Sequence, residues 1–81
     1  MSDLRTWRAD QKKTLSELAV LLNVGGIKPE RTVQRFETGE RPVSLEMALL
    51  IQRITDGAVD PADMDATRQA WLARQGTEAA A

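Results

Sequence analysis

The stretch TLSELAVLLNVGGIKPERTVQRFETG, residues 14–39, decides the fold class of this chain. At its start, Thr14 and Glu17 have the spacing of a capping box, in which each side chain accepts a hydrogen bond from the other residue's backbone N–H. The apolar residues that follow recur at helical intervals and form one face: Leu15, Leu18, Ala19, Leu21 and Leu22. Asn23-Val24-Gly25-Gly26 then ends this helix, since glycine adopts a positive φ without a Cβ penalty.

A second helix is predicted from Lys28-Pro29-Glu30 onward. Proline suits the first turn of a helix, and a glutamate there complements the positive end of the helix dipole. Val33 and Phe36 lie three residues apart on the side expected to be buried, and Gly39 ends the helix after Thr38. The stretch therefore contains two short helices joined by a glycine-containing turn.

Helical spacing continues on both sides of this stretch. We expect one helix over residues 3–12, capped by Ser2 or Asp3, and another over residues 45–55, capped by Ser44. A last helix begins at Asp60-Pro61 and either runs to Arg74 or breaks near Asp65. No strand-like alternation occurs, so the prediction is a compact all-α domain of four to five helices. Residues 1–64 form its main part, and residues 65–81 form a C-terminal helical extension with a frayed tail from Gly76.

The composition excludes several classes of protein. The 81 residues contain neither Cys nor His, which removes disulfides, the commonest metal ligands and the usual general base near neutral pH. No apolar run approaches the ~18 residues of a membrane span, and the N-terminus lacks the apolar segment of a signal peptide. We therefore expect a cytoplasmic protein that is not an enzyme and uses no metal, cofactor, small-molecule substrate or membrane. Asp60, Asp63 and Asp65 are interpreted as helix-start residues rather than catalytic groups.

The formal net charge of −1 is unevenly distributed along the chain. Residues 1–41 contain eight basic and six acidic side chains, whereas residues 42–81 contain three basic and six acidic ones. A basic first half is compatible with nucleic-acid binding despite the low overall charge. An acidic second half would face away from phosphate and weaken non-specific binding.

The order of these elements resembles the Cro and lambda-repressor-like (XRE-type) helix-turn-helix family of small DNA-binding regulators. The resemblance is carried by Leu4-x-x-Trp7-Arg8, Thr14-x-x-Glu17-Leu18-Ala19-x-x-Leu22-x-Val24, Thr32-Val33-Gln34-Arg35-Phe36-Glu37-x-Gly39-x-Arg41, Ser44-Leu45-Glu46 and Gly57-Ala58-Val59-x-Pro61-x-Asp63-Met64. Three features depart from the family. The turn between the second and third helices is longer, Leu15 replaces a frequent Gln that touches the DNA backbone, and Pro42 lies one position early. The resemblance implies a helix-turn-helix DNA-binding domain at residues 1–64.

A recognition helix reads bases through outward side chains near its N-terminal half. With Val33 and Phe36 facing inward, the predicted base-reading residues are Arg31, Gln34, Arg35, Glu30 and Thr32. Arg matches guanine O6 and N7, Gln matches adenine, Thr can meet a thymine methyl, and a carboxylate can accept from cytosine N4. The predicted phosphate contacts are Lys28, Arg41, Lys12, Lys13 and Thr38.

These residues also have simpler interpretations. Gln34 and Arg35 are compatible with a solvated helix face, Lys12-Lys13 with solubilising charge, and Glu30 with a dipole-complementing role. Arg8 and Glu37 match a family pair that ties the first helix to the end of the third, which implies a structural role that leaves Arg8 unavailable to DNA. Trp7 and Phe36 are expected in the core.

The helix expected at residues 45–55 is apolar on two opposite sides. Leu45, Ala48, Leu49 and Gln52 cluster on one side, and Met47, Leu50 and Ile54 nearly opposite. Trp71 is expected to pack on the second cluster and to expose an edge to another protomer. The predicted dimer or partner surface is therefore Met47, Leu50, Ile54, Trp71 and Leu72.

The expected function is a sequence-specific regulator of transcription that binds double-stranded operator DNA as a homodimer. We expect a repressor or autoregulator of a small phage-like or antitoxin-like operon in the bacterial cytoplasm or nucleoid, with a partner protein as an option. The alternative is a small helical protein–protein interaction adaptor in which the basic helix is incidental.

Overall fold

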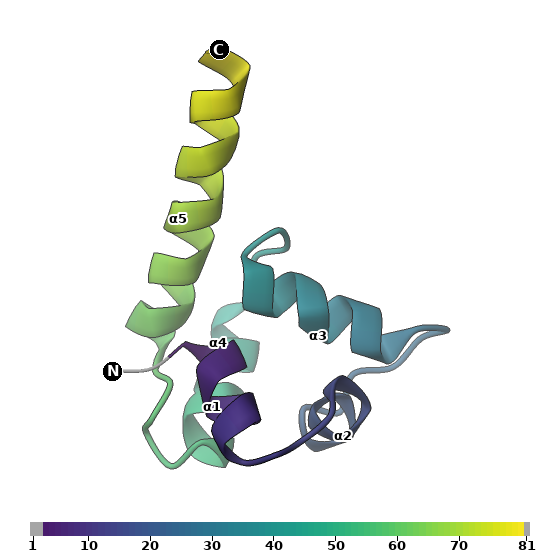
Figure 1. Cartoon of the computed structure of the whole chain (residues 1–81). Coiled ribbons are helices and arrows are strands. Elements are labelled where there is room, and N and C mark those ends of the chain that lie inside the picture. Colours follow the sequence, from purple (N-terminus) through teal and green to yellow (C-terminus); the bar gives the residue numbers. More distant parts are fainter. Residues whose placement is uncertain (1–2, 81) are drawn as a thin grey trace.

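The computed structural model describes the backbone of residues 3–80 and the side chains of residues 3–76. These residues form five α-helices and no strand, which confirms the predicted all-α class. The helices are α1 (Leu4–Asp10), α2 (Leu15–Leu21), α3 (Pro29–Thr38), α4 (Leu45–Ile54) and α5 (Pro61–Ala80). The four short helices gather into one body, and α5 starts at that body and projects away from it (Figure 1). In the described chain no helix has both the length and the apolar composition needed to cross a membrane.

Side-chain caps begin four of the five helices. Asp3 accepts a hydrogen bond from the N–H of Thr6 at 2.7 Å, and Ser44 accepts one from the N–H of Met47 at 3.1 Å. The capping box of α2 is confirmed, with Thr14 and Glu17 joined by reciprocal hydrogen bonds of 3.1 and 3.0 Å. Asp60 and Asp63 make the same reciprocal pair at α5, at 2.8 and 3.1 Å. These side chains satisfy N–H groups that the first turn of a helix leaves unpaired.

Two predicted helix ends, those of α1 and α5, were wrong. Helix α1 stops at Asp10 rather than near residue 12, because Lys12 has a left-handed φ of 56°. Helix α2 ends just before Asn23-Val24-Gly25-Gly26, as predicted, but the first left-handed φ there, of 54°, belongs to Asn23 and not to a glycine. Helix α5 neither breaks near Asp65 nor ends at Arg74, because residues 62–75 contain no Pro or Gly and are rich in alanine. The boundary expected between residues 64 and 65 therefore falls inside one helix. Ser2 and the last residue of the expected tail, Ala81, lie outside the described residues.

The core draws on all five helices and on the loop before α5. Its buried members are Leu4, Leu18, Ala19, Leu22, Val33, Phe36, Ile51, Val59 and Met64. The predicted burial of Val33 and Phe36 is confirmed, and Trp7 packs against this cluster while half-buried. Leu21, expected on the apolar face of α2, is 42% exposed. Helix α2 packs more extensively against α3 than against any other helix, so this pair forms a unit within the body.

The capping box of α2 gives a test of local stability. Thr14→Ala removes the hydroxyl that accepts from the N–H of Glu17, and we expect the free energy of unfolding near neutral pH to fall by about 1 kcal/mol. Urea unfolding followed by circular dichroism measures this change. Ser16→Ala is the matched control, because Ser16 is exposed on the same helix. A loss in the control as large as in the Thr14 variant would contradict the capping role.

The same box makes stability depend on acid. The hydrogen bond from the backbone N–H of Thr14 lowers the pKa of Glu17 below its ordinary value. The contribution of the ionised Glu17 side chain to the free energy of unfolding is therefore present above the pKa that Glu17 has in the unfolded chain. It is lost as the pH falls through the pKa of Glu17 in the folded protein. Acidification from about pH 6 to pH 3 should destabilise the wild type more than Glu17→Gln.

Candidate nucleic-acid interface

The solvent-facing side of α3 brings three predicted base-reading residues together. Val33 is fully buried and Phe36 is 7% exposed, so residues between these inward positions turn toward solvent. Arg31 and Gln34 are exposed, and Arg35 is half-buried. A shallow hollow of about 250 Å³ is lined by Arg31, Gln34, Arg35, Thr38 and Glu40. Glu30 and Thr32 are half-buried and lie outside the lining of this hollow.

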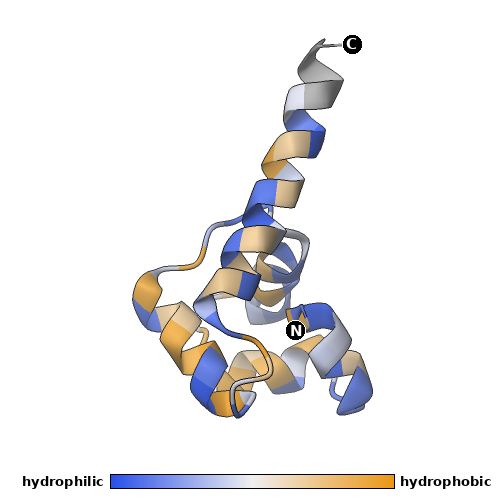
Figure 2. Cartoon of the chain, turned by 90° about the vertical axis from the view of Figure 1, so that its left-hand side faces the viewer, coloured by the Kyte–Doolittle hydropathy of each residue, from blue (hydrophilic) through white to orange (hydrophobic). Residues whose placement is uncertain are grey.

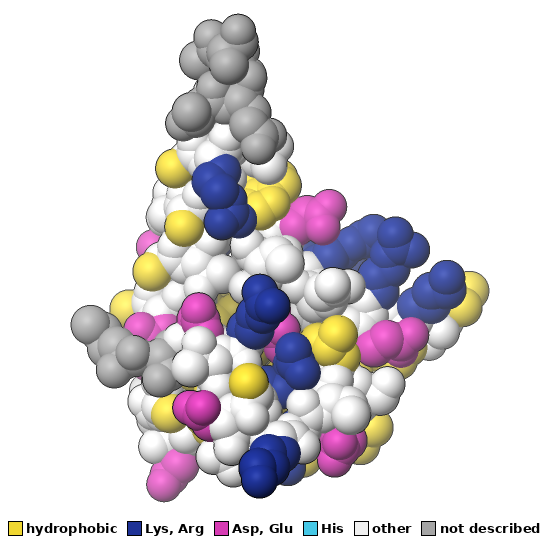
Figure 3. All heavy atoms as spheres, in the orientation of Figure 1, with side chains coloured by type: hydrophobic (Ala, Val, Ile, Leu, Met, Phe, Trp, Pro, Cys, Tyr) yellow, Lys and Arg dark blue, Asp and Glu magenta, His cyan; other side chains and the backbone are white. Residues whose placement is uncertain are grey.

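Basic side chains gather over α3 and the turn that precedes it, on the right-hand side of the molecule in Figure 3. Lys28 and Arg41 are both exposed and flank the two ends of α3. Lys28 occupies the N-cap position and makes no side-chain capping hydrogen bond. The predicted phosphate contacts Lys28 and Arg41 are therefore accessible, one before and one after α3.

The other predicted phosphate contacts differ in position. Thr38 lines the hollow but its hydroxyl is already hydrogen-bonded, whereas Lys12 and Lys13 do not line it. The Thr38 hydroxyl donates to the carbonyl of Arg35 at 3.2 Å and accepts from the N–H of Glu40 at 3.3 Å, so its proton is already used. Lys12 and Lys13 lie in the turn between α1 and α2. Lys13 is half-buried and lines a different hollow with Glu17, Val20 and Leu21. The Lys12-Lys13 pair therefore takes no part in lining the α3 hollow.

The predicted pair of Arg8 and Glu37 is confirmed on the inner side of α3. Arg8 Nε and Nη2 donate to the two carboxylate oxygens of Glu37 at 2.5 and 3.2 Å, and Nη1 donates to the carbonyl of Lys13 at 3.0 Å. The Glu37 side chain is only 3% exposed and the Arg8 side chain 20%. The hydrogen bond to Glu37 raises the pKa of Arg8. All three nitrogens of this guanidinium are engaged, so Arg8 is a link between α1 and α3.

Sequence reasoning missed the contacts around the end of α3. Arg35 Nε lies 3.7 Å from a carboxylate oxygen of Glu40. Arg68 Nη1, on α5, donates to the carbonyl oxygens of Gly39 and Glu40 at 2.9 and 2.8 Å. The guanidinium of Arg68 lies 5.3 Å from the centre of the Trp71 ring. The sequence signal that could have indicated this last contact is the spacing of Arg68 and Trp71, three residues apart on one helix face.

No match to this chain is found among protein-family models, curated proteins or solved structures.

The predicted apolar surface needs correction. Met47, Leu50 and Ile54 are half-buried and pack against the core, because α4 turns this side and Ile51 inward. The exposed hydrophobic residues of α4 are Leu45, at 69%, and Leu49, at 48%. Figure 2 shows that α4 is hydrophobic over most of its length, so one apolar side stays uncovered after the other is buried.

Trp71 makes a contact that the sequence did not predict. Its Cβ lies 2.9 Å from the position that a Cβ on Gly39 would take, so it packs against the end of α3. Leu72 is 40% exposed, on the next position of α5. Trp71 therefore contributes to joining α5 to α3.

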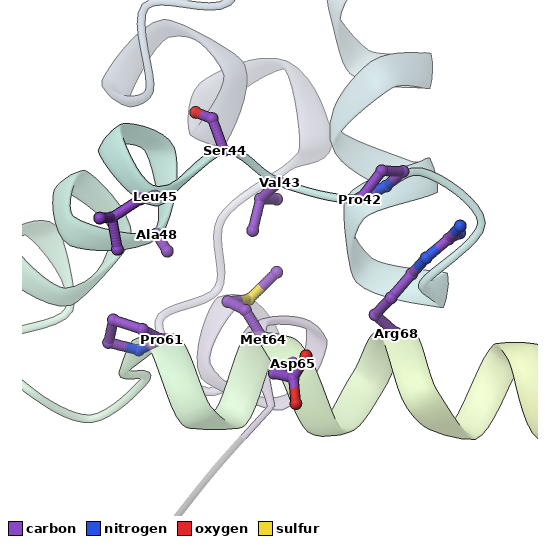
Figure 4. A pocket seen from close by; sticks show the side chains of 9 residues that line it. All are labelled: Pro42, Val43, Ser44, Leu45, Ala48, Pro61, Met64, Asp65 and Arg68. Atoms are coloured by element: carbon purple, nitrogen blue, oxygen red, sulfur yellow. The ribbon is translucent and has the colours of Figure 1, made fainter.

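A cleft of about 220 Å³ opens between the start of α4 and α5. Its lining is Pro42, Val43, Ser44, Leu45, Ala48, Pro61, Met64, Asp65 and Arg68. In Figure 4, Met64 points from α5 toward the loop that precedes α4, and Leu45 stands at the rim. The cleft is mainly apolar and lies beside the exposed leucines of α4.

Proposed function

We propose that this protein is a sequence-specific DNA-binding regulator of transcription, in which α3 enters the major groove. The observation that carries the proposal is the shared hollow of Arg31, Gln34 and Arg35 on the solvent-facing side of α3. Arginine presents two donors to the O6 and N7 of guanine, and the amide of glutamine matches the N6 and N7 of adenine. Three such groups on one exposed helix face suit the edges of successive base pairs.

The surroundings of α3 support this use. The open N-terminus with Lys28 suits a phosphate, because the first N–H groups of a helix and its dipole favour anions. Helix α2 packs on α3 and can rest across the DNA backbone, as the first helix of a helix-turn-helix pair does. Arg8 and Glu37 fix the inner side of α3, which leaves its outer side free for contact.

In this proposal the protein binds DNA as a homodimer. It acts as a repressor or autoregulator of a small operon in the bacterial cytoplasm. A single small module buries little surface on DNA, so two copies on half-sites about 34 Å apart are the usual route to operator affinity. The exposed Leu45, Leu49 and Leu72 are among the apolar side chains available for such an interface, in place of the half-buried cluster on α4. Occupying a promoter then excludes polymerase.

The test begins with selection of bound sites from random double-stranded DNA. A palindromic site is expected if a two-fold dimer binds. On that site, Arg31→Ala and Arg35→Ala should each lose about 1–3 kcal/mol of binding free energy, measured by fluorescence anisotropy, and relax specificity at one base position. Arg53→Ala, on the exposed side of α4, is the matched control for the loss of one positive charge.

A second candidate function is a protein–protein interaction adaptor. The observation in its favour is the apolar cleft between α4 and α5, with Leu45 69% exposed at its rim. An adaptor predicts that the wild-type protein shows no salt-dependent binding to DNA at all. That result would overturn the DNA-binding proposal and favour the adaptor.

A further inference from the structure

We infer that Arg68 of α5 is a positioning residue that sets the specificity of DNA reading by holding the end of α3. The inference rests on the proposed function, since it concerns how Arg35 is presented to a base. Arg68 itself lies outside the α3 hollow, so any effect on DNA reading has to pass through other residues.

First, Arg68 is hydrogen-bonded to the turn that follows α3. One terminal nitrogen of its guanidinium donates to the carbonyl oxygens of Gly39 and Glu40, at 2.9 and 2.8 Å. These two residues follow directly on Thr38, the last residue of α3. The cation also satisfies carbonyls at the negative end of the helix dipole. Its position over the Trp71 ring restricts the side chain further.

The second step is the close approach of α5 to the same turn. A Cβ on Gly39 would lie 2.5 Å from the backbone carbonyl oxygen of Thr67 and 2.9 Å from the Cβ of Trp71. Backbone thus stands against backbone at this point. The turn therefore has little freedom to move relative to α5, so the distance between Arg68 and the carbonyls of Gly39 and Glu40 is fixed.

The third step leads from the turn to Arg35. The carbonyl of Arg35 accepts hydrogen bonds from the N–H groups of Gly39 and Arg41, at 3.1 and 3.3 Å. The carboxylate of Glu40, whose carbonyl Arg68 holds, lies 3.7 Å from Arg35 Nε. The contact with Glu40 restrains Arg35. Its side chain is still accessible, because 41% of its surface is exposed. Arg68, Glu40 and Arg35 form a continuous series of contacts from α5 to the hollow.

A restrained arginine affects specific binding more than non-specific binding. Reading a base edge needs the guanidinium within a narrow range of positions, and a pre-organised side chain loses less freedom when it binds. A phosphate, in contrast, accepts a positive charge from many directions. Loosening the turn should therefore lower the ratio of specific to non-specific affinity, and change non-specific affinity little.

The experiment compares Arg68→Met, Arg68→Lys and the charge-matched Arg53→Ala in the full chain. Methionine keeps the apolar stem on Trp71 and removes the donors, and circular dichroism checks that each variant is folded. Affinities for the selected duplex and for a scrambled duplex are measured by anisotropy at one salt concentration. Arg68→Met should lower the ratio of the two affinities about threefold to tenfold, Arg68→Lys should restore part of it, and Arg53→Ala should leave it unchanged.

Repeating Arg68→Met in an Arg35→Ala background separates positioning from general stability. If Arg68 acts through Arg35, the ratio should not fall further in the double variant. An unchanged ratio in Arg68→Met, or an equal fall with and without Arg35, overturns this inference and leaves the proposed function intact. Absence of DNA binding by the wild type overturns both. Should the methionine variant fail to fold, a wild-type ratio in folded Arg68→Gln would overturn the inference equally.

Discussion

Arg8→Met is expected to lower the free energy of unfolding by about 3 kcal/mol. The substitution leaves the carboxylate of Glu37, which is 3% exposed, without the guanidinium that now satisfies it. An uncompensated buried charge costs more than the pair itself contributes, because the carboxylate has lost water and gained no partner. In a domain of this size the loss corresponds to a fall in Tm of about 12–24 °C. Thermal and urea unfolding followed by circular dichroism measure it.

Two further variants show whether the buried charge is the cause. Arg5→Met removes an exposed arginine from the same helix and should change stability by less than about 0.5 kcal/mol. Arg8→Met combined with Glu37→Leu removes both charges and should recover most of the loss. Equal destabilisation by the single and the double variant would assign the effect to the lost hydrogen bond from Arg8 to the carbonyl of Lys13 instead.

Gly39→Ala should destabilise the protein by about 3 kcal/mol, for two reasons that add. The residue has φ of 90°, a conformation that strains any side chain with a Cβ. The new Cβ would also lie 2.5 Å from the carbonyl oxygen of Thr67, a backbone atom that cannot rotate away. Helix α5 would have to move off the end of α3, and urea unfolding should show the loss.

The chain contains matched glycines that separate these two causes. Gly57 has φ of 86°, and a Cβ added there would meet nothing within 4 Å, so Gly57→Ala should cost only the backbone strain, about 1 kcal/mol. Gly25 has neither a positive φ nor a close neighbour, and Gly25→Ala should be neutral or slightly stabilising. If Gly39→Ala cost no more than Gly57→Ala, the close contact between α3 and α5 would be refuted.

Features set by neighbours along the chain could be predicted from the sequence. The capping box at Thr14, the start of α3 at Pro29 and its end at Gly39 depend on spacings of three or four residues. The inward side of α3 follows from Val33 and Phe36 in the same way, and it fixes which side chains of the hollow face outward. The pair of Arg8 and Glu37 is 29 positions apart and was predicted through a family resemblance rather than through spacing.

Features that depend on how helices dock could not be predicted. Helix α4 is apolar nearly all round, so the sequence does not say which side the core covers. In the structure Met47 and Ile51 face the core, and Leu45 faces solvent. Trp71 was assigned to α4 because both are apolar, and nothing in the spacing showed that the absence of a Cβ on Gly39 lets α5 approach the end of α3 as well. The hydrogen bonds from Arg68 to the carbonyls of Gly39 and Glu40 follow from that approach and have no signal in the local sequence.

Helix α3 is anchored more firmly at its C-terminal end than at its N-terminal end. Its C-terminal half is clamped to α1 through Glu37 and to α5 through the carbonyls held by Arg68. Its N-terminal end has no side-chain cap, and the adjoining Gly25 and Gly26 have open space around them. We therefore expect the end of α3 at Pro29 to shift more readily than the end at Thr38. In the proposed complex, Arg35 near the clamp would tolerate little variation in its base pair, while Arg31 near the free end would follow the groove as it widens or narrows.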